Sequence, residues 1–135
     1  MTRAAELKKR ILFVDDEPAV LAGLQAVLRR DSRRWDIVFA VGAAHALEEL
    51  RRNPFDAVVS DFRMPGIDGA TLLLLVWQEC PRTARIMLTG DVDDAALFAV
   101  RPALHTLLFK PCGIGAIRDA IERGLITHKE DAAMR

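Results

Sequence analysis

Short apolar runs alternate with segments of helical spacing along the whole chain, and this alternation constrains the fold more than any other feature. Five mostly apolar runs have the length and composition of strands buried on both faces. They are Ile11–Val14, Trp35–Ala40, Asp56–Asp61, Arg85–Thr89 and Thr106–Phe109. Five helices are expected between and after them: one opening at Pro18, one from Ala43 to Leu50, one from Gly69 to Glu79, one from Val92 to Arg101, and a last one carrying Ile114, Ile117, Ile121 and Leu125.

Strands that alternate with helices predict an α/β fold with a doubly wound parallel sheet, covered on both faces and joined by right-handed crossovers. A chain of this size with five strands fits the flavodoxin-like strand order 2-1-3-4-5. In that order strands 1 and 3 are neighbours, so their carboxyl ends would bring Asp15, Asp16 and Asp61 together at the switch point.

The helical spacing also predicts which side chains face the core. In the first helix the predicted inward positions are Val20, Leu21, Leu24, Val27 and Leu28. In the helix from Gly69 to Glu79 they are Leu72, Leu73 and Val76. Leu74, Leu75 and Trp77 then lie toward the outside, either as an apolar partner surface or as isolated exposed side chains.

Length and composition indicate one globular domain. The chain has 135 residues, of which 51% are hydrophobic, and its 19 basic and 19 acidic side chains balance, so neither a nucleic-acid groove nor a membrane surface is indicated. Cys80 and Cys112 are too few for a disulfide framework, so we expect free thiols in a cytoplasmic protein. We expect Cys112 to have a packing role and not a redox role. We expect the domain at residues 8–127, with tails at 1–7 and 128–135.

Polar side chains follow four of the predicted strands. Asp15 and Asp16 end the first and Asp61 the third, and three close carboxylates cannot all stay ionised without a cation, for which Mg²⁺ is the natural partner. Thr89 ends the fourth strand and Lys110 the fifth. Carboxylates, a hard cation, a hydroxyl and an ammonium are the groups needed to hold a phosphoryl group. Each residue alone has a simpler reading, such as Asp61 as a helix or turn cap, or Glu17 complementing a helix N-terminus.

In this order and spacing, these residues resemble the receiver domain of bacterial two-component response regulators. The resemblance runs from about residue 9 to residue 123 and rests on Asp15-Asp16, Asp61, Met64-Pro65-Gly66-Ile67-Asp68-Gly69, Thr89-Gly90 and Lys110-Pro111. Each motif alone is weak, but the ordered set at successive strand ends is specific.

The resemblance implies a role for each residue. Asp61 would accept a phosphoryl group from a phosphohistidine, with Asp16, Asp61 and the Arg63 backbone carbonyl binding Mg²⁺ and Asp15 holding a metal-bound water. The remaining roles concern the phosphoryl group. Lys110 would pair with Asp61 and then with the phosphoryl oxygens, Thr89 would turn its hydroxyl inward, and Pro111 would follow a cis peptide bond.

Two departures from the family pattern affect how a signal would leave the site. Receivers commonly carry Tyr or Phe three residues before the lysine, where this chain has Leu107, so we expect a weak or altered switch. Phe109 is aromatic but should point to the opposite face of the strand from Lys110. Arg63 and Asp91 flank the pocket, and their opposite charges suggest an ion pair over it.

The resemblance implies a non-enzymatic signalling module. Its partners would be a sensor histidine kinase or a histidine phosphotransfer protein, together with a downstream protein, because no output domain is expected in this chain. Homodimerisation through the fourth helix, fifth strand and fifth helix is a habit of the family. An unphosphorylated scaffold is an alternative. An aspartyl-phosphate phosphohydrolase is disfavoured because Arg63 occupies the position of its second Asp, and a dinucleotide-binding protein because no G-x-G-x-x-G follows the first strand.

Overall fold

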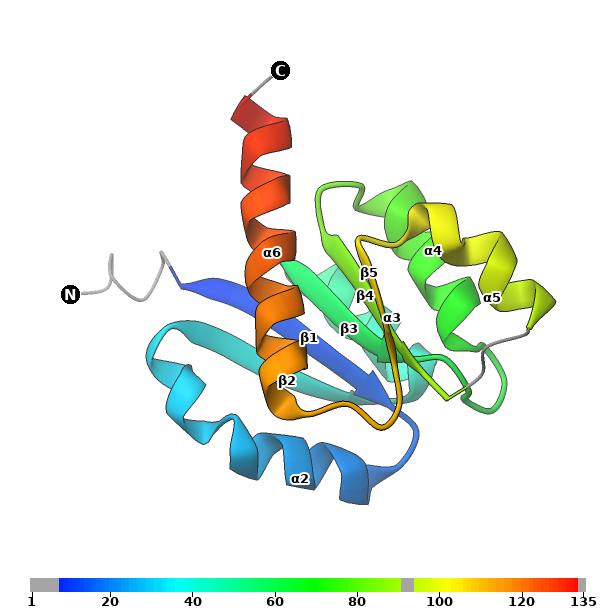
Figure 1. The fold of residues 1–135 in the computed structure, drawn as a ribbon, viewed down its shortest axis with the longest axis horizontal. Helices are drawn as coiled ribbons and strands as arrows, with labels where there is room; N and C mark the ends of the chain where they lie inside the picture. The colour runs from blue at the N-terminus through cyan, green and yellow to red at the C-terminus, as the bar shows by residue number, and fades with distance from the viewer. Residues whose placement is uncertain (1–7, 91–93, 134–135) are drawn as a thin grey trace.

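The protein has one five-stranded parallel sheet in the order β2-β1-β3-β4-β5, which confirms the predicted topology (Figure 1). The computed structural model describes residues 8–90 and 94–133. The strands are β1 (Lys9–Asp15), β2 (Trp35–Val41), β3 (Ala57–Asp61), β4 (Ala84–Thr89) and β5 (Thr106–Phe109). Each differs from its predicted bounds by at most two residues at either end. In β1, β3 and β4 the apolar runs that predicted the strands are also their buried parts, whereas the edge strands β2 and β5 are mostly half-buried.

The connections are helical. The helices are α2 (Pro18–Val27), α3 (Gly42–Arg52), α4 (Gly69–Glu79), α5 (Ala95–Val100) and α6 (Ile114–Ala133), with 3₁₀ turns η1 (Arg29–Arg33) and η2 (Arg101–Ala103). The predicted start of the fourth helix, Val92, lies outside the described residues. The helix α6 continues to Ala133, so residues 128–133 of the expected C-terminal tail are helical. Within the described ranges, none of the helices combines the length and apolarity that crossing a membrane requires.

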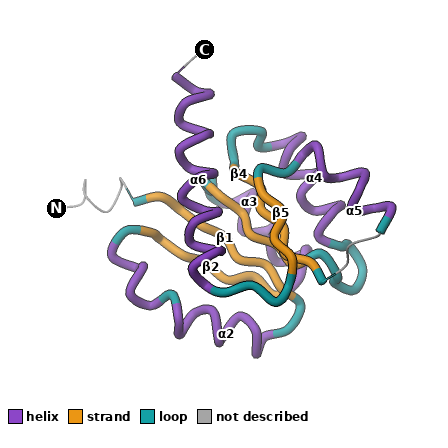
Figure 2. Tube along the Cα trace, viewed as in Figure 1, coloured by secondary structure: helices purple, strands orange, loops and turns teal. Residues whose placement is uncertain are grey.

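Helices lie on both faces of the sheet (Figure 2), and an apolar core is packed against each face. Side-chain alternation divides the strands between them: Leu12 and Val14 of β1 face α3, α4 and α5, whereas Ile11 and Phe13 face α2 and α6. Burial of the central strands on both faces explains their continuous apolar runs, and polar side chains lie near the two ends of the strands.

The helical faces agree with the sequence only in part. In α4, Leu72, Leu73 and Val76 are fully buried, as predicted, while Trp77 is exposed. In α2, Leu21 is buried, but the inward prediction is wrong for Val20 and Val27, which are 40% and 50% exposed. The sheet contacts only the narrow stripe that contains Leu21 and Leu28, so neighbouring apolar positions remain at the surface.

Leu74 and Leu75 of α4 are half-buried, Leu74 against the core on that face, so Trp77 is the exposed member of the predicted outer group. Glu17 occupies the N-cap position of α2 but makes no capping hydrogen bond with its side chain. The expectation that Glu17 complements this helix is therefore confirmed for its position and not for a side-chain contact.

Candidate functional site

The carboxyl ends of β1 and β3 bring three acidic side chains together, as the strand order predicts. Asp15 ends β1 and Asp61 ends β3, and both are buried, while Asp16 is half-buried. One oxygen from each carboxylate lies within 4.8 Å of the others. The strands are neighbours in the sheet, with Val14 of β1 opposite Ser60 of β3, so the cluster follows directly from register.

Lys110 and Thr89 close the same edge of the sheet. The Lys110 ammonium donates a hydrogen bond to Asp61 Oδ1. The Lys110 backbone N–H donates to the Thr89 carbonyl at 2.8 Å, which ties the end of β5 to the end of β4. Thr89 is 1% exposed, and the Lys110–Pro111 peptide bond is cis, as predicted. The structure therefore groups an ammonium and a hydroxyl-bearing residue with the three carboxylates.

The charges of the cluster shift the pKa values of its members. Burial raises the pKa of Asp15, and the neighbouring charges of Asp61 and Asp16 raise it further. Two effects oppose this rise: the Glu17 backbone N–H donates to Asp15 Oδ1 at 2.9 Å, and Lys110 carries a positive charge nearby. Burial would lower the pKa of Lys110, but the hydrogen bond and charge of Asp61 outweigh it and the pKa is raised. Lys110 is therefore a stable cation, and the crowded carboxylates favour a further positive charge.

The backbone of Asp61 is held from two sides, a feature that the sequence did not reveal. Ser60 Oγ donates to the Asp61 carbonyl at 2.9 Å. The Gly69 N–H donates to the Phe62 carbonyl at 2.8 Å, which closes the loop that follows Asp61. A Cβ atom at Gly69 would lie 2.1 Å from the Asp61 carbonyl oxygen. Glycine is thus required here for close approach of two backbones.

Arg63 forms its described ion pair with Asp94, a residue that was not among the sequence predictions. Its guanidinium contacts Asp94 Oδ2 and lies 4.9 Å from the centre of the Phe62 ring. Asp94 is the N-cap of α5 and accepts from the N–H of Ala96 at 2.8 Å. The hypothesised partner Asp91 lies outside the described residues. The sequence did hold a signal for Asp94, because Asp before an apolar helix is a common N-cap.

Leu107 occupies the position expected for a switch aromatic. It is half-buried and packs with the core on the α4 and α5 face, opposite Met87 of β4. Phe109 is 41% exposed, and Leu108 between them belongs to the other core. The aromatic ring near the site is therefore a surface group, and the position of Leu107 is filled by an aliphatic core residue.

The histidines and cysteines have structural roles where they are described. His45 Nδ1 accepts from the Val41 N–H at 3.1 Å, and His105 Nδ1 accepts from the Arg85 N–H at 2.9 Å. Cys80 and Cys112 are free thiols, and each packs against an apolar core, as expected.

The acidic cluster fits a hard divalent cation. All three side chains offer carboxylate oxygens, which Mg²⁺ prefers, and one oxygen from each lies close enough to the others to share one ion. Within the described ranges this is the one group of His, Cys, Asp and Glu side chains with spacing suited to a metal.

Comparisons with known proteins agree with this geometry. Residues 11–122 match the response regulator receiver domain family. The chain is 31% identical over 126 residues to response regulator protein PilR of Pseudomonas aeruginosa, covering 93% of this chain and 28% of PilR. The chain thus spans about a quarter of the length of that curated relative.

Solved structures share the fold over nearly the full length. A response regulator receiver domain protein from Clostridium thermocellum has a TM-score of 0.80 at 27% identity, covering 90% of this chain and 97% of that one. A chain described as adenylate cyclase from Rhodopirellula baltica has a TM-score of 0.84 at 29% identity, covering 95% of both chains. From its matched sequence and its fold, the chain belongs to the receiver domain family of two-component response regulators.

Proposed function

We propose that Asp61 is the phosphoacceptor of this receiver domain and takes its phosphoryl group from a phosphohistidine of a partner protein. The observation that carries this proposal is the Lys110 ammonium on the Asp61 carboxylate, beside the acidic pair Asp15 and Asp16. A buried strand-end carboxylate with one cationic neighbour and one oxygen directed to the cluster is a suitable nucleophile toward phosphorus.

In the transfer step, an Asp61 carboxylate oxygen forms a P–O bond while the P–N bond of the phosphohistidine breaks. The electron pair of that bond leaves with the imidazole, which is then neutral or takes a proton from water. Lys110 moves from the carboxylate to the phosphoryl oxygens, and the Thr89 hydroxyl donates to one of them. Both groups neutralise charge where it develops.

Asp16, Asp61 and the Arg63 backbone carbonyl would hold Mg²⁺, and Asp15 would hold a water bound to it. When bound, the ion supplies positive charge to the cluster and to the phosphoryl oxygens. The rest of the chain's contribution is positioning, because Ser60 and Gly69 fix the backbone that carries the nucleophile.

The signal then reaches a partner through a surface near the site. The fourth helix, fifth strand and fifth helix of the domain are α5, β5 and α6, and they carry two exposed aromatic rings, Phe98 at 77% and Phe109 at 41%. These rings support the proposal that this face binds a downstream protein or a second copy. With Leu107 in the core, the Arg63–Asp94 pair is the described polar link from the Asp61 loop to α5.

The proposal is tested by incubating the protein with Mg²⁺ and acetyl phosphate and measuring intact mass. The wild type should gain the mass of one phosphoryl group, and Asp61→Asn should abolish the gain. Asp119→Asn, an exposed carboxylate of α6, is the matched control and should behave as wild type. If the wild type gains no mass with either acetyl phosphate or a phosphorylated histidine kinase, the domain is an unphosphorylated scaffold.

A further inference from the structure

The outer edge of β2 is a long and lightly protected strand edge. Among the described strands β2 pairs with β1 alone, so one side of its backbone is open. It has seven residues, whereas β5 at the other edge has four, and its single charged side chain is Asp36. Such an edge is usually covered, shortened or charged, because its N–H and C=O groups can pair with another strand.

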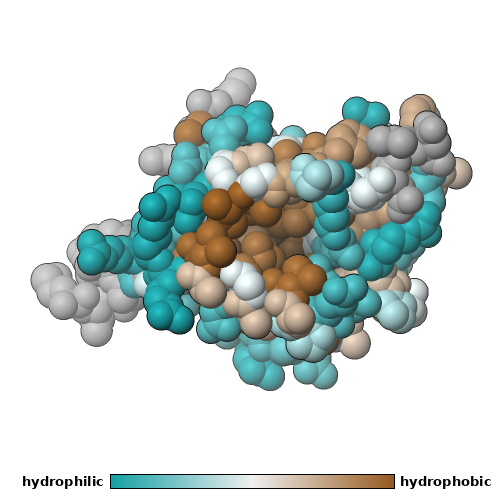
Figure 3. All heavy atoms as spheres, turned by 60° about the horizontal axis from the view of Figure 1, so that its bottom comes forward, coloured by the Kyte–Doolittle hydropathy of each residue, from teal (hydrophilic) through white to brown (hydrophobic). Residues whose placement is uncertain are grey.

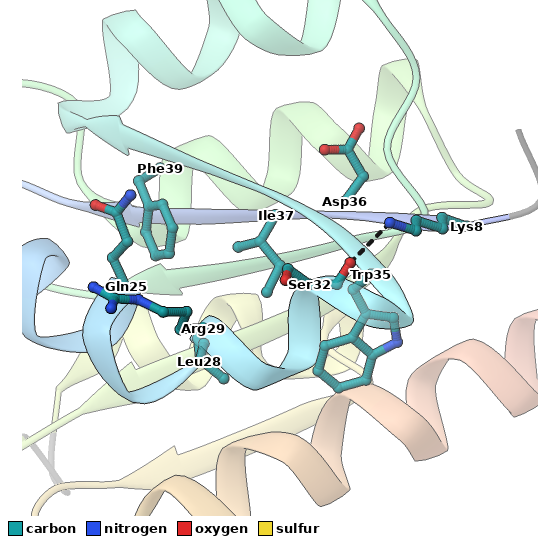
Figure 4. A pocket seen from close by; sticks show the side chains of 9 residues that line it. All are labelled: Lys8, Gln25, Leu28, Arg29, Ser32, Trp35, Asp36, Ile37 and Phe39. Carbon is teal, nitrogen blue, oxygen red and sulfur yellow. Dashed lines mark hydrogen bonds between the residues drawn. The ribbon is translucent and has the colours of Figure 1, made fainter. Parts of the chain in front are cut away.

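A pocket with apolar walls and a polar rim, called the apolar pocket after its walls, adjoins this edge (Figure 4). Its volume is about 520 Å³, and β2 supplies four of its nine lining residues. Ile37 and Phe39 from β2 and Leu28 from α2 form apolar walls, with Gln25 and Arg29 of α2 and η1 along the rim. Figure 3 shows that the surface on the α2 side is hollowed and apolar at its centre, with hydrophilic side chains around it. The pocket can therefore take an apolar side chain from a segment lying along β2.

A cationic hollow lies next to the apolar pocket. Its volume is about 730 Å³, and it shares Arg29 and Ser32 with the apolar pocket. Five arginines line it, three of them from η1, together with Asp31 and with Glu122, which pairs with Arg34. The exposed side chains of Arg29, Arg30 and Arg33 have no carboxylate partner among the described side chains, those of residues 8–90 and 94–126. A ligand that enters the apolar pocket thus meets three uncompensated positive charges beside it.

The charged side chains nearby do not neutralise Arg29, Arg30 and Arg33. Arg34 and Arg118 have their own carboxylate, since both contact Asp31 at 3.0 Å. Asp36 on the rim accepts from Arg10 at 3.1 Å, so its charge is also met. Lys8 adds another cation, because it donates to the Ser32 carbonyl and not to a carboxylate.

We propose that this surface binds an extended acidic segment of a partner polypeptide. The segment adds a strand to the edge of β2, places an apolar side chain between α2 and β2, and sets its carboxylates on Arg29, Arg30 and Arg33. Trp35 lies opposite Lys9 and Val41 opposite Asp15, so the arginine end of β2 is at the other end of the sheet from Asp61. The proposed surface is therefore separate from the phosphorylation site.

Other occupants fit fewer of these features. Duplex nucleic acid and an anionic lipid surface match the arginines, but they make no use of an open strand edge. A second copy of this chain would offer its own edge strands, β2 and β5, which carry one carboxylate between them, Asp36. That single group cannot neutralise three arginines.

The test is an NMR titration of the full-length, isotope-labelled protein with a short capped peptide that alternates glutamate and valine. Backbone amides of β2 and η1 and the Trp35 indole should shift. The triple variant R29E/R30E/R33E should bind at least about tenfold more weakly, the equivalent of three exposed ion pairs. The matched triple R51E/R82E/R101E changes the net charge equally at exposed arginines elsewhere and should bind as wild type. Equal weakening in both triples overturns the proposal.

Two further experiments separate the contribution of the strand edge to peptide binding from that of the pocket. Peptides N-methylated on the edge-facing amides should lose binding, while those methylated on the alternate amides should retain it. Gln25→Phe should fill the mouth of the pocket and weaken peptide binding without removing a core side chain. The proposal is overturned if the acidic peptide does not bind. It is also overturned if the arginine triple instead abolishes binding of duplex DNA or phosphatidylglycerol vesicles, or self-association, with the peptide unaffected.

Discussion

Gly69→Ala should impair phosphorylation of Asp61 without touching any group that carries out the chemistry. The added Cβ would lie 2.1 Å from the Asp61 carbonyl oxygen and 3.0 Å from the Asp61 carbonyl carbon. Contacts below 3.0 Å essentially do not occur, so one of the two backbones must recede by roughly 1 Å. Because both are backbone segments tied by the hydrogen bond from Gly69 to Phe62, a side-chain rotation cannot relieve the clash.

A displacement of this size has a predictable effect on the reaction. Misplacing a reacting group by about 1 Å costs on the order of 100-fold in rate, so the rate of phosphorylation by acetyl phosphate should fall by about that factor. Overpacking should also lower the free energy of unfolding by about 1–3 kcal/mol. The assay is a time course of intact mass with saturating Mg²⁺, with thermal unfolding measured on the same sample.

Gly23→Ala in α2 is the matched control. A Cβ there meets nothing within 4 Å, so phosphorylation should be unchanged and the helix should gain about 0.5–1 kcal/mol. A folded Gly69→Ala protein that is phosphorylated at the wild-type rate would refute the reasoning, because it would show that the Asp61 backbone need not occupy its observed position.

Three further predictions concern ion pairs away from the nucleophile. Asp31→Asn should lower the free energy of unfolding by about 3 kcal/mol in urea titrations, because it leaves Arg118 without its buried carboxylate. Burial would raise the pKa of Asp31, but hydrogen bonds and charges from Arg118 and Arg34 lower it below 3.8, so its stabilisation is present above that pH and is lost as the pH falls further. The acid limb of a stability–pH curve should therefore be flatter in Asp31→Asn, and an unchanged limb would contradict this. Arg63→Ala should shorten the lifetime of phosphorylated Asp61 by up to about fivefold if its ion pair shields the site. Asp94→Asn keeps a good N-cap for α5 and should shorten the lifetime similarly; a wild-type lifetime in both would remove the idea.

The apolar periodicity of the sequence predicted the architecture and the polar residues that meet at the carboxyl ends of the strands. The five apolar runs could be read as strands because both faces of a parallel sheet are buried, and strand order then placed Asp15, Asp16 and Asp61 at one edge. Lys110 and Thr89 followed from the same rule, since each stands at the end of its strand. These conclusions depend on the local residue pattern and on the connection rules of parallel sheets, which leave few possible strand orders.

Tertiary structure decided the contacts that link elements distant in the chain. Arg63, in the loop after β3, pairs with Asp94 at the start of α5 because the two segments pack together in the fold. The close approach of Gly69 to Asp61 depends on the conformation of the loop between them, which the residue pattern does not encode. Val20 and Val27 have helical spacing yet remain exposed, because the sheet contacts a narrower stripe of α2 than the periodicity spans. The tertiary structure also leaves the arginines of η1 unpaired, because Asp31 forms its ion pairs with Arg34 and Arg118 and not with Arg29, Arg30 or Arg33. The sequence specifies which residues end each strand, because that depends on local pattern. Long-range packing determines which side chains form ion pairs and which remain exposed at the surface.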